Sequence, residues 1–228
     1  MSFKVLVTCP PMLKQIDQFR DLFTSLDIEI TTPNVVQTLS VEQLIEIVPL
    51  HDGWIIGDDP ATYEVFEAGV KGKLKAAVKW GIGTDNIDFN ACKALEIPIA
   101  NTPNMFGNEV ADIALGYIIG LARETFFIHS SIKEGEWPKI CGISLYGKTV
   151  AIIGNGDIGS SLAKRLEVLG MKINIYDPKF INTKNKKNMN FYEWPSRIDE
   201  ADFLVITCSL NNDNYHMINK DIFDMIKS

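Results

Sequence analysis

Three glycines in the stretch Gly154-Asn155-Gly156-Asp157-Ile158-Gly159 have a spacing suited to binding phosphate groups. The first allows a tight turn, the second lets the backbone approach a pyrophosphate, and the third permits close packing of a helix on a strand. The free amides and the dipole at the start of that helix favour negative charge. Asp177 follows at close to the ~20 residues at which an acid accepts hydrogen bonds from an adenosine ribose. The pattern predicts a dinucleotide site.

The segments around these glycines are typical of a strand, a turn, a helix and a second strand. Residues 149–153 are a short apolar run rich in β-branched side chains, as expected of a buried strand, and residues 172–176 are expected to form the second strand. Residues 161–169 have apolar side chains at helical spacing and end at Gly170. The order of these elements agrees with a nucleotide-binding βαβ unit.

Charged residues beside the glycines bear on which dinucleotide is bound. The carboxylate of Asp177 would repel a 2′-phosphate, which favours NAD over NADP. Lys179 lies close enough along the chain to leave NADP open as the alternative. Asp157 is an acid beside the expected pyrophosphate, so we expect it in the first helical turn, where the dipole favours negative charge.

Composition excludes several classes of protein. The chain has 228 residues, a net charge of −7 and a pI near 5.0, which argue against a nucleic-acid or anionic-membrane partner. No apolar run approaches the ~20 residues of a membrane span, and the N-terminus lacks a signal-peptide layout, so we expect a cytoplasmic protein. The cysteines lack metal-ligand spacing and are interpreted as reduced packing residues: Cys9, Cys92, Cys141 and Cys208.

The chain divides into two regions in which strands and helices alternate. In residues 1–101, apolar runs predict strands at 4–8, 28–31, 54–56, 75–79 and 97–100, and helical spacing predicts helices at 13–26, 41–48 and 63–70. This alternation predicts a parallel sheet with helices on its faces. In residues 102–228 we expect a long helix at 108–123, three strands at 149–153, 173–176 and 203–207, and an exposed polar loop at 184–190.

Several motifs resemble those of one enzyme family. The stretches 79–88 (KWGIGTDNID), 97–103 (IPIANTP) and 109–112 (EVAD) are similar to the D-isomer-specific 2-hydroxyacid dehydrogenases, closest to the phosphoglycerate dehydrogenase type. The glycine pattern followed by Tyr176-Asp177-Pro178, and the stretch 201–205 (ADFLV), fit the same family. The resemblance covers essentially the whole chain.

This resemblance implies the fold, the reaction and the partners. It implies an α/β protein with a flavodoxin-like substrate-binding lobe at 1–101 and a Rossmann NAD-binding lobe at 102–228. The reaction would transfer a hydride between NAD and a small 2-hydroxy or 2-keto acid, with a 3-phosphoglycerate-like acid as one possibility. The family commonly forms homodimers through the cofactor lobe and its long helix, here 108–123.

The resemblance also implies roles for individual residues. The loop containing Ile82 and Gly83 would hold the substrate carboxylate through backbone N–H groups, a task that suits glycine. Lys79 could add positive charge there or be an exposed lysine, and Asn104 could contact substrate or be a turn residue.

Further positions match those around the cofactor in the family. They are Val110, Asp157, Ile158, Asp177 and Cys208, in addition to the three glycines of the turn. Asp112 stands where the family usually has glutamate, which we interpret as a conservative structural change.

The family's catalytic arginine, acid and histidine match no residue of this chain. His51, His129 and His216 are interpreted as structural or solvated, so we assign no catalytic residue and expect the 228-residue chain to be inactive alone. A truncated product would leave the nucleotide-binding lobe incomplete, with the strand at 203–207 at an open sheet edge. A non-catalytic nucleotide-binding or partner-binding relative is the alternative. A different enzyme on the same scaffold is a third possibility, for which no base is nominated.

Overall fold

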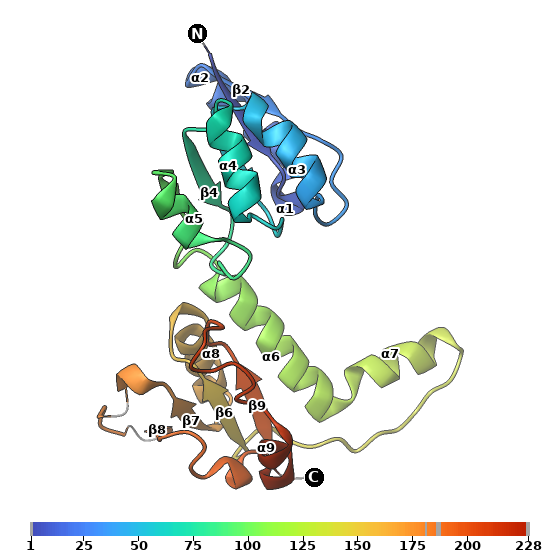
Figure 1. Cartoon of the computed structure of the whole chain (residues 1–228). Coiled ribbons are helices and arrows are strands. Elements are labelled where there is room, and N and C mark those ends of the chain that lie inside the picture. The colour runs from blue at the N-terminus through green and yellow to red at the C-terminus, as the bar shows by residue number, and fades with distance from the viewer. Residues whose placement is uncertain (1, 181, 186–187, 227–228) are drawn as a thin grey trace. The chain divides into compact units, whose positions relative to one another are not determined.

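The computed structural model describes residues 2–180, 182–185 and 188–226, which form an α/β fold with two compact units (Figure 1). The first unit comprises Met1–Met105 and the second Phe106–Ser228. The sequence placed the division between residues 101 and 102. Each unit has its own parallel sheet and its own apolar core.

The first unit contains a five-stranded parallel sheet in the order β2-β1-β3-β4-β5, the flavodoxin-like order. The strands are β1 (Phe3–Val7), β2 (Ile28–Thr31), β3 (Gly53–Ile56), β4 (Ala76–Lys79) and β5 (Ile99–Ala100). Because every strand runs in the same direction, the loops that follow β1, β3 and β4 lie at one edge of the sheet. The region that resembles a substrate-binding loop follows β4.

Helices cover this sheet and bury its apolar side chains. They are α1 (Pro10–Leu13), α2 (Arg20–Ser25), α3 (Val41–Ile47), α4 (Tyr63–Lys71) and α5 (Phe89–Ala94), with 3₁₀ turns η1 (Ile16–Gln18) and η2 (Val48–Leu50). The helix α3 begins with a capping box between Ser40 and Gln43. Leu44 and Phe66 from α3 and α4 are fully buried against Trp54 of β3.

Two predictions for the first unit need correction. The single helix expected at 13–26 is wrong, because α1, η1 and α2 replace it. Gln15 leaves the helical region (φ −119°, ψ 14°), and the breaks allow Ile16 and Phe19 to pack into the same cluster, where Phe19 meets Trp80 edge-on. The helix α5 was not predicted, although its start carries a signal: the Asp88 side chain accepts a hydrogen bond from the Ala91 amide.

The second unit contains a parallel sheet in the order β8-β7-β6-β9 within the described residues. Its strands are β6 (Thr149–Ile153), β7 (Lys172–Tyr176), β8 (Met189–Phe191) and β9 (Phe203–Ile206). Side chains alternate along β6: Val150 and Ile152 pack beneath helices, and Ala151 and Ile153 point to the other face. As expected, β9 lies at the edge of the described sheet.

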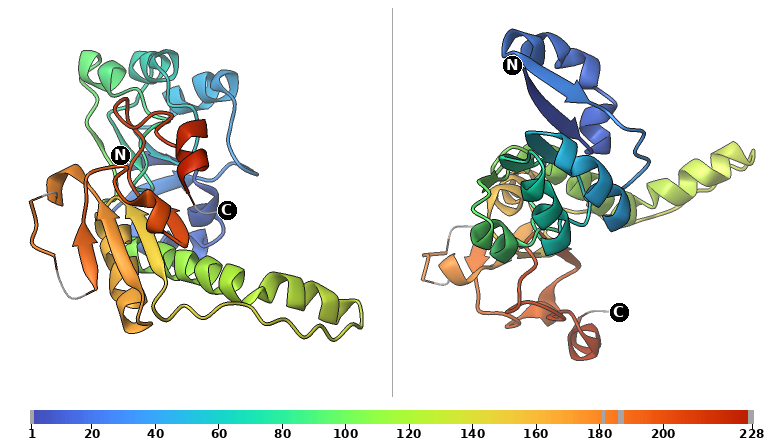
Figure 2. Two further views of the ribbon diagram at one scale, coloured as in Figure 1. Left: turned by 90° about the horizontal axis from the view of Figure 1, so that it is seen from below. Right: turned by 45° about the horizontal axis from the view of Figure 1, so that its top comes forward.

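The helices of this unit are α6 (Gly107–Arg123), α7 (Thr125–Lys133), α8 (Asp157–Val168) and α9 (Lys220–Met225), with 3₁₀ turns η3 (Pro178–Phe180) and η4 (Ile198–Glu200). The helices α6 and α8 pack side by side on one face of the sheet (Figure 2). Arg165 of α8 pairs with Asp112 of α6 at 2.7 Å, so Asp112 helps to join the two helices. No helix in the described ranges is long and apolar enough to cross a membrane.

The second unit also differs from the sequence predictions in several places. Three strands were expected, but β8 is a fourth, so the predicted loop at 184–190 is wrong for Met189 and Asn190; residues 186–187 lie outside the described residues. The β8 strand is held by pairing with β7 and by Phe191, which stacks on Phe180. These contacts are tertiary, so local sequence could not indicate them.

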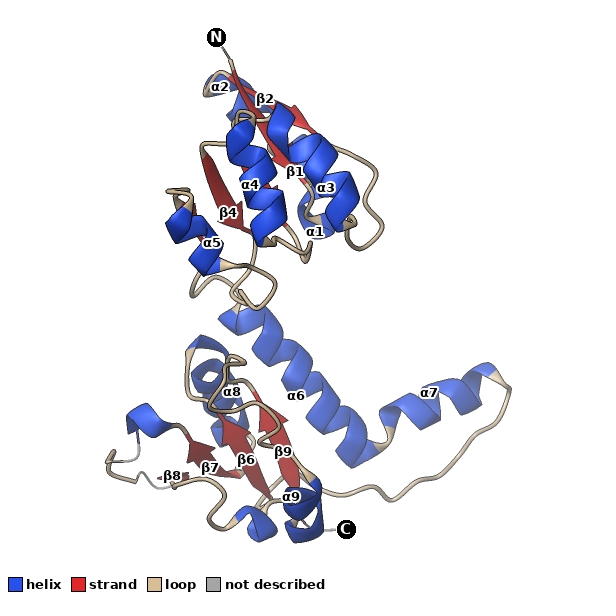
Figure 3. Ribbon diagram, viewed as in Figure 1, coloured by secondary structure: helices blue, strands red, loops and turns tan. Residues whose placement is uncertain are grey.

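The helix α7 was not predicted, because the chain turns between α6 and α7 through a single residue, Glu124, with φ 53°. Figure 3 shows α7 extending away from the sheet of this unit and a long loop returning to β6. Cys141 in this loop is exposed, so the interpretation of all four cysteines as packing residues is wrong for this one. The others are buried or half-buried.

Candidate cofactor and substrate sites

The glycine turn between β6 and α8 has the geometry of a phosphate cradle. Gly154 has φ +93°, and a Cβ added there would lie 2.7 Å from the backbone nitrogen of Cys208. A Cβ on Gly159 would lie 2.0 Å from the Gly154 carbonyl oxygen, whereas one on Gly156 would meet nothing within 4 Å. The first and third glycines therefore serve close packing, and the second borders open space that a ligand can fill.

The start of α8 leaves backbone amides free for an anion. Gly156 is the residue that precedes the helix, and it has no side chain to cap the first amides. Asp157 lies in the first helical turn, as expected, and Ile158 follows it. The cradle and these amides fit a dinucleotide pyrophosphate.

The Asp157 carboxylate turns toward the start of α6. A Cβ on Gly107 would lie between 2.2 and 2.4 Å from the carboxylate atoms, so only glycine is compatible with this position. Within the described residues, Oδ2 of Asp157 is buried without a hydrogen-bond partner. The carboxylate lies near the first turns of α6 and α8, whose dipoles offset its negative charge.

Asp177 lies where β7 ends, beside the glycine turn. Its Oδ2 accepts a hydrogen bond from the Asn155 amide at 2.8 Å, and its Oδ1 accepts one from the Lys179 amide at 2.9 Å. Each oxygen keeps lone pairs for further donors. The two amides therefore fix the carboxylate in an orientation from which it could accept ribose hydroxyl groups.

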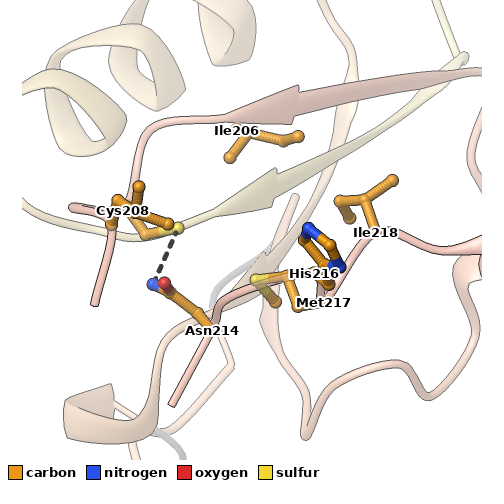
Figure 4. A pocket seen from close by; sticks show the side chains of 7 residues that line it. Ile206, Cys208, Asn214, His216, Met217 and Ile218 are labelled. Atoms are coloured by element: carbon orange, nitrogen blue, oxygen red, sulfur yellow. Dashed lines mark hydrogen bonds between the residues drawn. The ribbon is translucent and has the colours of Figure 1, made fainter. Parts of the chain in front are cut away.

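Cys208 follows β9 and lines a pocket of about 260 Å³ (Figure 4). The lining residues are Ile206, Cys208, Leu210, Asn214, His216, Met217 and Ile218. The Asn214 side-chain amide donates to the Ser209 carbonyl at 2.6 Å and approaches the Cys208 sulfur at 3.7 Å. Burial raises the pKa of the Cys208 thiol, and the negative charge of Asp177 adds to this effect, so the thiol is neutral at pH 7.

Asn214 and the other residues of this pocket apart from Cys208 were not predicted as site residues. The polar run after β9, which reads NNDN at 211–214, was the available signal in the sequence. This run folds back over the end of β9 through tertiary contacts, which the local sequence does not indicate.

The loop after β4 presents unpaired amides. Gly81 (φ +141°) and Thr102 exchange two hydrogen bonds, from the Gly81 amide to Thr102 Oγ1 and from the Thr102 amide to the Gly81 carbonyl. The Asn101 side chain donates to the Ile82 carbonyl at 3.1 Å. The amides of Ile82 and Gly83 have no acceptor among the described residues, so they are available to an anion.

Lys79 is buried at the end of β4, so the alternative of an exposed lysine is wrong. Its ammonium group donates a short hydrogen bond to the Gly57 carbonyl and one of 2.8 Å to Asp58 Oδ1. Asn104 is an exposed residue with φ 56°, the conformation of a turn asparagine. Val110 is a partly exposed residue of the first turn of α6.

The three histidines have different surroundings. His51 is buried, with Nδ1 at 2.8 Å from the Ile47 carbonyl and Nε2 at 2.7 Å from Thr31 Oγ1. His129 is exposed on α7, and His216 stacks on Tyr215 beside the pocket of Cys208. Both nitrogens of His51 have partners that fix its ring within the first unit.

Comparison with known proteins identifies the family. Residues 115–228 match the family model described as D-isomer specific 2-hydroxyacid dehydrogenase, NAD binding domain. A hydroxypyruvate reductase of Thermotoga maritima is 31% identical over 220 residues, which cover 95% of this chain and 69% of that protein. This chain belongs to the D-isomer-specific 2-hydroxyacid dehydrogenases. The family predicted from the motifs at 79–88, 97–103 and 109–112 is confirmed, and so is NAD as its cofactor.

A second sequence relative and one solved structure are also similar to this chain. A glyoxylate/hydroxypyruvate reductase of Arabidopsis thaliana is 31% identical, with 97% of this chain and 68% of that protein covered. The NAD⁺-bound structure of a 3-phosphoglycerate dehydrogenase of Entamoeba histolytica superposes with a TM-score of 0.81 at 25% identity. It covers all of this chain, which spans 69% of that one. This chain thus spans about two thirds of the length of these relatives.

The open space beside Gly156 leads to a first prediction. We expect Gly156→Ala to leave the melting temperature unchanged but to weaken NAD binding about tenfold or more, because the added methyl group would occupy the space of the pyrophosphate. Isothermal titration calorimetry and thermal melting measure the two quantities. Gly116→Ala in the exposed part of α6 is the matched control and should leave NAD affinity unchanged without lowering the melting temperature, because alanine is the better helix former. Unchanged NAD affinity in Gly156→Ala would contradict the assignment of the cradle.

The placement of Asp177 leads to a second prediction. We expect Asp177→Asn to weaken NAD binding and to reduce the preference for NAD over NADP, because the charge that repels a 2′-phosphate is removed while the shape of the side chain is kept. Dissociation constants for both dinucleotides, measured in the same buffer, give the ratio. Asp199→Asn in the same unit is the control. An unchanged ratio would remove Asp177 from this role.

Proposed function

We propose that this chain provides the NAD site and part of the substrate site of a dehydrogenase acting on a small 2-hydroxy or 2-keto acid. The observation that carries the proposal is the glycine cradle, in which Gly154 is packed on the backbone of Cys208 while Gly156 borders open space. Membership of the family supports the same reaction. When bound, NAD would accept or supply the hydride at the carbon that bears the hydroxyl or keto group.

The second unit would bind the cofactor, as the lobe expected at 102–228. Gly154, Gly156 and Gly159 would form the turn around the pyrophosphate, and Asp177 would accept hydrogen bonds from the ribose. The pocket at Cys208 lies at the carboxyl end of β9, where dinucleotides bind to sheets of this kind, and its apolar lining suits the adenine ring.

Other residues of this unit have narrower roles in the proposal. Val110 and Ile158 would add apolar contacts to the bound cofactor. Asp157 would shape the turn from within the first turn of α8 without contacting the phosphates, since its carboxylate lies against Gly107.

The first unit would bind the acid, as the lobe expected at 1–101. The free amides of Ile82 and Gly83 would donate hydrogen bonds to the substrate carboxylate, and Gly81 with Thr102 would hold this loop in place. Lys79 would add positive potential from below the loop. Asn104 would serve as a turn residue, with substrate contact as the weaker alternative.

Proton transfer requires a base at the substrate site, and none of the three histidines is placed to act as one. Removal of a hydride from carbon needs a base to take the hydroxyl proton. His51 has partners for both ring nitrogens, and His129 is exposed on α7. His216 stacks on Tyr215 and lines the pocket proposed for the adenine ring, not the loop proposed for the substrate acid. We therefore expect the 228-residue polypeptide to bind ligands without turnover. The same observation favours the second candidate, a non-catalytic nucleotide-binding relative.

A third prediction separates these candidates. We expect glyoxylate to shift the backbone amide resonances of Ile82 and Gly83 in NMR spectra recorded with NAD present, because these amides would bind its carboxylate. Glycolaldehyde, which lacks the carboxylate, is the control and should not shift them. NADH absorbance should stay constant when the polypeptide is mixed with glyoxylate.

The NMR shifts and the NADH absorbance test different parts of the proposal. No shift with glyoxylate would contradict the dehydrogenase proposal and favour the non-catalytic relative. Oxidation of NADH would support the dehydrogenase and contradict only the expected inactivity of this polypeptide.

The second unit also has an apolar surface suited to a second copy of the chain. The exposed apolar side chains of α6 and α7 include Ile113, Tyr117, Leu121, Phe126 and Phe127. Contiguous apolar surface of this kind commonly forms protein interfaces. The family resemblance implies a homodimer through this long helix, so we propose a second copy as the partner.

A fourth prediction follows for this surface. We expect the chain to sediment as a dimer and Leu121→Asp to shift it to monomer, because a charge at an apolar interface lacks a partner. Val168→Asp on α8, at a side chain that is also highly exposed, is the control and should remain dimeric. A wild-type monomer, or a dimer that withstands Leu121→Asp, would contradict this interface.

A further inference from the structure

Lys79 and Asp58 form an ion pair beside the proposed carboxylate-binding loop. The Lys79 side chain is only 4% exposed, whereas that of Asp58 is 81% exposed. A Cβ on Gly81 would lie 3.4 Å from Lys79 Cε, so the lysine side chain passes next to the backbone of the 81–83 loop. Its ammonium group is held by the Gly57 carbonyl and by Asp58 Oδ1 at 2.8 Å. The positive charge is therefore near the loop but already partly neutralised.

The loops at this edge of the sheet are otherwise acidic. Residues 57–62 and 80–88 contain Asp58, Asp59, Asp85 and Asp88 and no lysine or arginine. Asp58, Asp85 and Asp88 line a cavity of about 390 Å³ next to Asn86. These carboxylates lie around the same loop ends, so their negative charges add at this surface.

Hydrogen bonds fix two of these carboxylates in place. Asp59 is fully buried and accepts hydrogen bonds from Thr8 Oγ1, the Gly57 amide and the Leu39 amide. Asp88 caps α5 through the Ala91 amide. These hydrogen bonds hold the Asp59 and Asp88 side chains in place at this edge of the sheet.

We propose that the Asp58–Lys79 pair makes this site select monoanionic 2-keto acids over acids that carry a second anionic group, such as a phosphate ester. This inference rests on the proposed function and narrows it. One carboxylate can be held by the Ile82 and Gly83 amides with the help of the nearby Lys79. A second anionic group held near the same loop would be repelled by the exposed carboxylates of Asp58 and Asp85, because charges within about 8 Å, one Debye length, are incompletely screened. The buried Lys79 beside them is already paired with Asp58.

This selectivity would favour a small 2-keto acid over a 3-phosphoglycerate-like acid, two substrates that the sequence left open. A 3-phosphoglycerate-like acid carries a carboxylate and a phosphate, and the phosphate would meet Asp58 or Asp85 instead of a free cation. Asp58 thus acts as a specificity-determining residue through its charge, without contact with the carboxylate of the substrate.

The test compares two acids that differ only by a phosphate group, hydroxypyruvate and 3-phosphohydroxypyruvate. Their dissociation constants are measured from the Ile82 and Gly83 amide shifts of the full chain with NAD present, at low and high salt. We expect hydroxypyruvate to bind more tightly, and the difference to shrink in high salt because salt screens the exposed carboxylates. Asp58→Asn should improve binding of the phosphorylated acid about fivefold relative to hydroxypyruvate.

Further variants separate the effect of the Asp58 charge from other effects of a substitution. Glu67→Gln on α4 removes a carboxylate paired with Lys71, away from the loop, and should not change the ratio. Asp58→Glu keeps the charge and should keep the selectivity. Asp85→Asn removes an exposed carboxylate of the same cavity and should shift the ratio in the same direction as Asp58→Asn, which provides a second test if the Asp58 variant fails to fold.

The outcomes are distinguishable. Equal binding of the two acids by the wild-type chain, or a ratio unchanged in both Asp58→Asn and Asp85→Asn, would overturn the selectivity and leave the proposed function standing. No amide shift with either acid would overturn the proposed function, and this inference with it.

Discussion

The close approach of Gly154 to the backbone of Cys208 is the contact on which the second unit depends. It requires a residue without a side chain, because a Cβ would lie 2.7 Å from the Cys208 nitrogen. Neighbouring strands reinforce the turn: the Gly154 amide donates to the Tyr176 carbonyl, and Thr207 Oγ1 donates to the Gly154 carbonyl at 2.8 Å. The ends of β6, β7 and β9 are thereby joined at one point, from which α8 begins with its amides exposed.

A comparable arrangement organises the first unit. The Gly57 carbonyl after β3 accepts hydrogen bonds from Lys79 at the end of β4 and from the Asn86 side chain in the loop that follows β4. Asp59 then holds the Gly57 amide and reaches Thr8 at the end of β1. In both units the parallel direction of the strands brings separate loops to the same edge, where backbone groups determine the geometry.

Backbone groups also explain how an acidic chain can bind anions. The net charge is −7, and the proposed sites contain several carboxylates beside the expected phosphates and carboxylate. Amides of Ile82, Gly83 and the first turn of α8 would provide the positive end of each interaction, and they carry no net charge. Side-chain carboxylates can then act by repulsion, Asp177 on a 2′-phosphate and Asp58 on a second anionic group of the acid.

The sequence by itself determined the features that depend on local order along the chain. The spacing of Gly154, Gly156 and Gly159 indicated the turn, because each glycine meets a local steric requirement of the backbone. Alternating apolar runs indicated the parallel α/β fold. The family followed from short motifs that are contiguous in sequence. Only tertiary structure decided the rest, because it depends on residues that are distant along the chain. The strand β8 exists through its pairing with β7, the helix predicted at 13–26 breaks so that Phe19 can meet Trp80, and Lys79 is buried because Gly57 and Asp58 of another strand end lie beside it.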